Sequence, residues 1–130
     1  MNASSGPFQL WLKGTMSDSV LSANSTLAAV DAAKLLEESK ASAIIVLENS
    51  IPAGIVTNKD LTIKIIAHSY PSDTPIRRIM TTPLVSIPPE TDMKTALQIM
   101  SSRKIRKLPI IENDQVLGII VASEIAVSAS

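Results

Sequence analysis

Several residue types are scarce or missing in this 130-residue chain, and each scarcity excludes a class of protein. The chain has no cysteine, which excludes disulfide frameworks, zinc ribbons and thiol nucleophiles. Only Phe8, Trp11 and Tyr70 are aromatic, so no stacking platform for single-stranded nucleic acid can be built. The formal net charge of zero argues against a broad basic face, and nucleic acid is therefore not expected as a partner.

Signals for membranes and export are missing too. No apolar run approaches the length that crosses a bilayer, and residues 1–7 lack the charged and apolar regions of a signal peptide. We expect a cytoplasmic protein with no membrane partner, in which residues 1–11 form a flexible tail. An apolar fraction of 45% is ordinary for a chain that folds around an apolar core.

Groups for catalysis and metal binding are equally scarce. His68 is the only histidine, and it falls near the end of an expected helix, where the helix dipole favours it. One histidine without cysteine cannot supply a cluster of soft metal ligands. No P-loop or paired-glycine phosphate motif occurs, and no nucleophile has a base at recognisable spacing. We therefore expect no enzyme, no metal site and no required cofactor.

The chain repeats itself with an offset of 64 residues and no gap. Searching for repeats comes before naming elements, because a missed repeat changes the whole fold assignment. Apolar positions coincide throughout, and identical residues meet at many places: Met16 and Met80, Ser22 and Ser86, Ala32 and Ala96, Lys40 and Lys104, Glu48-Asn49 and Glu112-Asn113, Gly54-Ile55 and Gly118-Ile119.

Each copy predicts a strand followed by a helix. The strand spans residues 20–22 in the first copy and 84–87 in the second, where prolines exclude a helix. Ser25 or Thr26, and Thr91, are the expected helix N-caps. The helix face follows i, i+3, i+4, i+7 spacing, with Met93, Ala96, Leu97 and Met100 matched by Ala29, Ala32, Ala33 and Leu36.

A hairpin and a second helix complete each copy. Apolar runs over 43–47 and 51–57 flank a polar turn at 48–50, and residues 108–111, 112–114 and 116–121 repeat this pattern. The isolated Gly54 and Gly118 indicate close backbone approach within strands. The second helix is expected from Asn58 to about His68, and its counterpart is cut short by Ser130.

The sequence thus predicts an α/β (α+β) fold of two tandem β-α-β-β-α repeats. The expected boundaries are a tail at 1–11, repeat 1 at 12–70, a linker at 71–78 and repeat 2 at 79–130. Neither repeat could bury its helical faces well alone. We expect the two to share a core, related by a pseudo-twofold axis and packed through their sheets.

Three segments resemble motifs of the CBS domain family, named after cystathionine β-synthase. They are Ile-Met-Thr-Thr-Pro-Leu-Val at 79–85, Lys-Leu-Pro-Ile-Ile-Glu at 107–112 and Gly-Ile-Val-Thr-Asn-Lys-Asp-Leu at 54–61. The resemblance covers roughly residues 12–125 and identifies a stand-alone CBS pair, or Bateman module. It implies a regulatory sensor that binds an adenosine ligand between its repeats, forms a homodimer as a four-repeat disc and acts on an unknown protein partner.

The motif at 54–61 contains the first half of the expected ligand site. Thr57 ends a strand and Asp60 lies in the first helical turn, with Asn58 and Lys59 between them. Free amide groups and the dipole at a helix start favour a phosphate, and a carboxylate can accept hydrogen bonds from both ribose hydroxyls. The alternative is that Thr57 and Asp60 are ordinary helix-start residues.

The second repeat supplies complementary groups. The resemblance implies that Lys104, Arg106 and Lys107 face the Thr57–Asp60 motif, where cations would form charge-assisted hydrogen bonds with phosphate. Leu84 and Val85 would line the adenine slot, with Ile55 behind them. Alternatively, the cations are a solvated strand entrance and the apolar residues are ordinary core.

The opposite cleft is expected to be the poorer one. Val121 replaces the threonine, Glu124 replaces the aspartate, and Lys40 alone remains of the three cations. We expect one competent site per chain, with AMP or ADP favoured, ATP as a further ligand, and a sulfonium ligand disfavoured by the cations. The alternatives are a ligand-independent dimerisation scaffold, or binding of another adenosyl ligand or a polyanion through residues 104–107 and 77–78.

Overall fold

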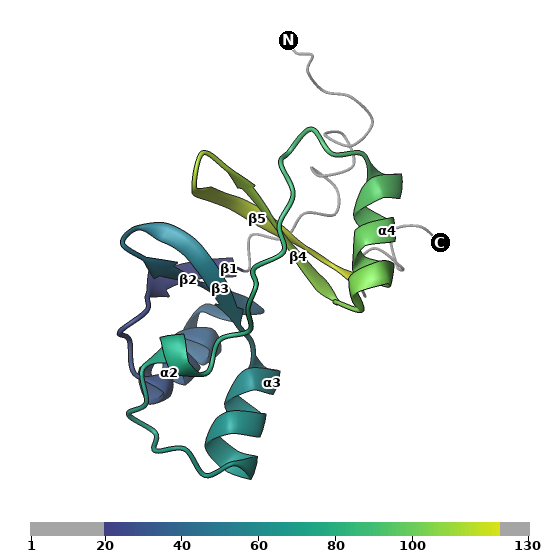
Figure 1. Cartoon of the computed structure of the whole chain (residues 1–130). Helices are drawn as coiled ribbons and strands as arrows, with labels where there is room; N and C mark the ends of the chain where they lie inside the picture. Colours follow the sequence, from purple (N-terminus) through teal and green to yellow (C-terminus); the bar gives the residue numbers. More distant parts are fainter. Residues whose placement is uncertain (1–19, 123–130) are drawn as a thin grey trace. The chain divides into compact units, whose positions relative to one another are not determined.

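The computed structural model describes residues 20–122, which divide into two compact units (Figure 1). The first unit ends at Leu84 and the second begins at Val85. Each unit combines helices with a small sheet, so the expected α/β class is confirmed. The tail predicted at 1–11 and the last short helix lie outside the described residues. The pseudo-twofold relationship and the packing through the sheets stay predictions.

The first unit contains a three-stranded sheet in the order β1-β2-β3. Strand β1 (Val20–Asn24) pairs parallel to β2 (Ala43–Glu48), and β2 pairs antiparallel to β3 (Ile51–Val56). Its helices are α2 (Ala29–Ser39), α3 (Asn58–Asp60), which continues as the π-helix η1 (Leu61–Ala67), and the 3₁₀ turn η2 (Ile76–Arg78). The helix predicted from Asn58 is confirmed.

The second unit repeats part of this arrangement. Helix α4 (Met93–Arg103) precedes the antiparallel strands β4 (Lys107–Glu112) and β5 (Gln115–Val121). Every residue pair of the β2–β3 hairpin recurs here shifted by 64 residues, including the register shift, and the β4–β5 hairpin has one further pair, Lys107 with Val121. The strand predicted at 84–87 is reduced to a single parallel bridge from Ile87 to Ile110. Pro88 and Pro89 follow at once and have no N–H group to extend the ladder.

Both hairpins turn through the same two-residue loop. Asn49 and Ser50 have φ angles of 51° and 68°, and Asn113 and Asp114 have 52° and 62°. Two positive φ angles define the type I′ turn, whose twist suits antiparallel strands. Asn and Asp tolerate this left-handed conformation better than most residues. The polar turns predicted from the sequence are therefore confirmed, and the residues that tolerate positive φ angles explain their positions.

The predicted helix caps need correction. Ala28, not Ser25 or Thr26, is the N-cap of α2, and it offers no side-chain hydrogen bond. Backbone carbonyls of the later segment take over this role. The N–H of Ala29 donates to the carbonyl of Thr74 at 2.8 Å, and the N–H of Val30 donates to that of Ser72 at 2.9 Å. Amides that a local side chain would usually satisfy are satisfied by residues more than 40 positions away.

Helix α4 is capped one residue later than predicted. Asp92 replaces Thr91 as its N-cap, and the N–H of Thr95 donates to Asp92 Oδ1 at 2.7 Å. This backbone hydrogen bond, together with one from the Thr95 side chain, lowers the pKa of the Asp92 carboxyl, because both bonds favour the ionised form.

Residues 71–78 do more than connect two repeats, although the predicted repeat boundaries stay predictions. Ile76 is fully buried in the core of the first unit, against Ala32, Ile44 and Val56 among others, and Ile79, the first residue after the segment, is buried there too. A segment that both caps α2 and fills this core is part of the folded unit. Its position explains why α2 needs no side-chain cap of its own.

The predicted helix faces are largely confirmed, with one shared difference. Ala32 and Leu36 are buried in α2, and Ala96 and Met100 are buried in α4. The i+4 members, Ala33 and Leu97, are exposed instead. Position i+4 lies at the edge of a helical stripe, so it leaves the core first when the helix rotates slightly.

Candidate functional site

Asp60 is the centre of a hydrogen-bonded cluster in the first unit. The N–H and the hydroxyl of Thr57 both donate to Asp60 Oδ2, at 2.8 Å and 3.2 Å. The hydroxyl of Thr81 donates to Asp60 Oδ1 at 2.7 Å. Thr57 is the N-cap and Asp60 the third helical residue, so their contact is a capping box at the helix start. The carboxylate is thereby fixed in orientation and remains half-buried.

Thr81 reaches Asp60 because its backbone joins the edge of β3. Its N–H donates to the carbonyl of Ile55 at 2.8 Å, and the N–H of Ile55 donates back at 3.2 Å. Gly54 permits this approach, because a Cβ atom there would lie 2.6 Å from Met80 Sδ and 3.1 Å from the Thr81 carbonyl oxygen. The prediction that Gly54 serves close backbone approach is confirmed.

Thr81 belongs to the Asp60 cluster but is not among the site residues predicted from the sequence. It belongs to the motif at 79–85, but nothing in that motif indicates a contact with a side chain 21 residues earlier. The one available signal is Gly54, since an isolated glycine inside a strand often marks a place where another backbone comes close.

The other candidates from this half of the site are placed as follows. Ile55 is half-buried within β3, and Leu84 is half-buried at the end of the first unit. Asn58 and Lys59 are exposed in the first helical turn. The structure therefore brings Ile55, Thr57 and Asp60 together with Thr81, whereas Asn58 and Lys59 present their side chains to solvent.

The remaining candidates belong to the second unit. Lys104 is the C-cap of α4 and has a left-handed backbone with φ of 55°, as Lys40 has at the end of α2 with 57°. The side chains of Lys104 and Arg106 are exposed, and those of Lys107 and Val85 are half-buried. The three cations lie in one short stretch where α4 gives way to β4. Their convergence on the Asp60 cluster stays a prediction.

The second copy of the Thr57–Asp60 motif lacks the hydroxyl group of the first copy. Val121, the counterpart of Thr57, ends β5 opposite Lys107 and has no hydroxyl group. Glu124, the counterpart of Asp60, lies outside the described residues. The expected asymmetry between two sites therefore stays a prediction.

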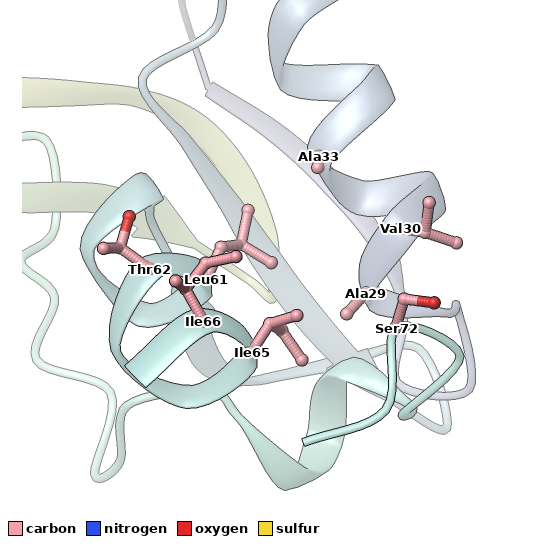
Figure 2. Close-up of a pocket in the computed structure, with 8 residues that line it drawn as sticks. All are labelled: Ala29, Val30, Ala33, Leu61, Thr62, Ile65, Ile66 and Ser72. Carbon is pink, nitrogen blue, oxygen red and sulfur yellow. The ribbon is translucent and has the colours of Figure 1, made fainter. Parts of the chain in front are cut away.

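A second surface feature of the first unit is a groove between α2 and η1 (Figure 2). Val30 and Ala33 line it from α2, and Leu61, Ile65 and Ile66 line it from η1. Its volume of about 230 Å³ is below the roughly 300–1,000 Å³ of small-molecule pockets. Thr62 and Ser72 are the polar members of its lining and no charged side chain belongs to it, so the groove is poorly suited to a phosphate.

The described part of the chain contains neither a candidate metal cluster nor a candidate membrane-spanning helix. Residues 20–122 contain no group of three or more His, Cys, Asp or Glu side chains that could hold a metal ion. Nor does any helix in this range combine the length and apolarity that a membrane span needs.

A comparison with known proteins also finds two similar parts in this chain. The pattern of the CBS domain matches residues 12–67 and again residues 76–128. The CBS domain-containing protein YhcV of Bacillus subtilis is 30% identical over 117 residues, which are 90% of this chain and 84% of YhcV.

Solved structures agree with this result. The hexameric CBS-CP12 protein from bloom-forming cyanobacteria is 31% identical with a TM-score of 0.75, over 85% of this chain and 66% of that one. The CBS domain pair of MJ0100, in complex with 5′-methylthioadenosine and S-adenosyl-L-methionine, shares the fold with a TM-score of 0.79 at 21% identity. It matches over 92% of this chain and 98% of its own. The chain belongs to the CBS domain family and contains two tandem copies of that domain.

Proposed function

We propose that this chain is a regulatory sensor that binds an adenosine nucleotide through Asp60 and Thr57 of the first repeat and the cations of the second. AMP or ADP is the favoured ligand, and ATP is a further candidate. The protein has no catalytic role in this proposal and requires no cofactor. Its output is a change in an unidentified protein partner, and its expected location is the cytoplasm.

The observation that carries this proposal is the fixed carboxylate of Asp60. The two donors of Thr57 hold its Oδ2 atom, at 2.8 Å and 3.2 Å, so the carboxylate needs little reorganisation when a ligand arrives. Preorganised groups lose less entropy on binding. A half-buried carboxylate can accept hydrogen bonds from the hydroxyls of a ribose. The adenosine ligands bound to the MJ0100 pair support the same ligand class.

The preference for a phosphorylated ligand rests on Lys104, Arg106 and Lys107. These side chains are exposed or half-buried and lie within four consecutive positions of the sequence. A guanidinium and two ammonium groups at such spacing can form charge-assisted hydrogen bonds with one phosphate. A positively charged sulfonium ligand would meet repulsion there. The proposal therefore favours AMP or ADP over S-adenosylmethionine.

Regulation would follow from binding in two parts. A ligand held by Asp60 in one repeat and by cations in the other has different affinities for different arrangements of the repeats. Only such a difference in affinity lets a ligand shift a conformational equilibrium. The bound arrangement is the form that a partner would recognise.

Calorimetric titration with AMP, ADP, ATP and S-adenosylmethionine tests the proposal. We expect AMP or ADP to bind at about one site per chain, and Asp60→Ala to abolish binding because the ribose acceptor is gone. Glu37→Ala is the matched control, since it removes an exposed carboxylate from α2 of the same unit. A folded wild-type chain that binds none of the four ligands would refute the proposal.

We further propose that two chains associate as a homodimer through the apolar groove between α2 and η1. Ile66 is 72% exposed and Val30 is 39% exposed beside the groove. An apolar patch of neighbouring residues on two helices typically marks a protein interface. A second copy of the same patch would be self-complementary in a twofold dimer. This observation also favours the alternative function, a dimerisation scaffold that needs no ligand.

A further inference from the structure

We propose that the Thr81 hydroxyl competes with the ribose hydroxyls for the Asp60 carboxylate, so that Thr81 sets the affinity of the adenosine site. This inference rests on the proposed function, because it concerns the same carboxylate. It adds a residue whose effect is opposite to that of Asp60 itself: removing the Thr81 hydroxyl should tighten binding.

The argument begins with the acceptor capacity of Asp60. A carboxylate offers about four lone-pair positions. Among residues 20–122, three donors already use it, namely the N–H and hydroxyl of Thr57 on Oδ2 and the hydroxyl of Thr81 on Oδ1. About one position is therefore free, on Oδ1. A ribose brings two neighbouring hydroxyls, so its second hydrogen bond requires one of the protein donors to leave.

The Thr81 hydroxyl is the donor that can leave with least disturbance. The N–H of Thr57 belongs to the backbone of the helix start and cannot turn away without opening the capping box. The Thr57 hydroxyl shares Oδ2 with that N–H, whereas Thr81 is the one donor to Oδ1 in the described part of the chain. Thr81 is exposed, so its released hydroxyl finds water at once. When Thr81 leaves, both ribose hydroxyls fit on Oδ1.

The backbone of Thr81 need not move in this exchange. Its two hydrogen bonds with Ile55, at 2.8 Å and 3.2 Å, are made by main-chain atoms. A rotation of the side chain is sufficient, and the edge of β3 stays intact. The need to displace the Thr81 hydroxyl therefore lowers the affinity for the ribose, while the fold of the unit is unchanged. A residue with these two properties can adjust ligand affinity without affecting stability.

The competition predicts different effects on two ligands. AMP has two ribose hydroxyls and displaces Thr81, whereas 2′-deoxy-AMP has one, which fits the free position. Thr81→Val replaces the hydroxyl with a methyl group of similar size and keeps the β-branch. We expect Thr81→Val to raise AMP affinity about two- to tenfold, the range of one net hydrogen bond, and to change 2′-deoxy-AMP affinity less. Thr81→Ser keeps the hydroxyl and should behave like the wild type.

Calorimetric titration of the full chain and both variants with AMP and 2′-deoxy-AMP tests this inference. Thermal unfolding checks that each variant is folded, and Thr81→Ala replaces Thr81→Val if the latter is not. Tighter AMP binding by the valine variant alone, with a larger ratio of AMP to 2′-deoxy-AMP affinity, supports the competition.

Two other outcomes overturn the inference and are distinguishable. If the wild type binds AMP and the folded valine variant binds it equally or more weakly, Thr81 is no competitor, although the sensor function stands. If neither the wild type nor any variant binds AMP, the proposed function fails and the inference fails with it.

Discussion

Gly54 lies so close to Met80 that a Cβ atom on the glycine would be 2.6 Å from the Met80 sulfur. Such a distance is well inside normal packing contact. The same Cβ would lie 3.1 Å from the Thr81 carbonyl oxygen, which is backbone and cannot rotate away. The lack of a side chain at Gly54 therefore permits Met80 and Thr81 to lie against β3, where Thr81 reaches Asp60.

Gly54→Ala should therefore destabilise the protein by about 1–3 kcal/mol, the usual cost of overpacking. Chemical denaturation of the wild type and variant measures this difference. Met80→Ala is the partner for a double-mutant cycle. Because the sulfur makes the closest contact, Gly54→Ala should cost less in the Met80→Ala background. Equal costs in both backgrounds would mean that the contact with Met80 is not the cause.

Asp92 should give the protein a measurable pH dependence of stability. Its pKa is lowered in the folded state by hydrogen bonds from Thr95. A carboxyl with a lowered folded pKa stabilises the fold above its unfolded pKa, and this contribution is lost as pH falls through the folded pKa. Asp92→Asn keeps a capping side chain but cannot ionise.

The unfolding midpoints of wild type and Asp92→Asn should consequently diverge with pH. We expect the stability of the wild type relative to the variant to be greatest above the unfolded pKa of 3.8, and to decrease as pH falls through that value and then through the lower folded pKa. Thermal melts at several pH values measure the difference. Asp114→Asn, at an exposed hairpin turn, is the control. Parallel curves for wild type and Asp92→Asn would contradict the role of Asp92.

Arg106→Ala should separate phosphate recognition from adenosine recognition. Loss of a charge-assisted hydrogen bond at an exposed site should weaken AMP binding about tenfold, and should leave adenosine binding nearly unchanged. Arg103→Ala removes another exposed arginine, in the last turn of α4, and serves as control. Titration with AMP and adenosine provides the comparison. An equal loss for both ligands would show that Arg106 does not contact phosphate.

Ile66→Asp should weaken self-association through the groove between α2 and η1. A charge buried in an apolar interface has no partner and is costly. Sedimentation velocity over a range of concentrations measures the monomer–dimer equilibrium. Ile51→Asp is the matched control, because Ile51 is 54% exposed at the start of β3 and does not line the groove. A dimer that withstands Ile66→Asp would place the interface elsewhere.

The candidate site was only partly predictable from the sequence. Thr57 and Asp60 were recognisable because their capping box depends on residues three positions apart. The caps of α2 and α4 were predicted wrongly, since Ser25, Thr26 and Thr91 are all good cap residues by type. Residue type alone could not show that the carbonyls of Ser72 and Thr74 would accept hydrogen bonds from the first N–H groups of α2.

The sequence by itself determined the tandem repeat, the α/β class, the hairpins and their turns. These features depend on neighbours within a few residues: alternation and apolar runs set the strands, and paired residues that tolerate positive φ set the turns. The tertiary structure alone decided that Thr81 meets Asp60, that Gly54 receives Met80 and that residues 71–78 cap α2 and complete its core. These contacts join residues that are 20 or more positions apart, and their geometry is fixed by packing against a sheet edge, which no local pattern encodes.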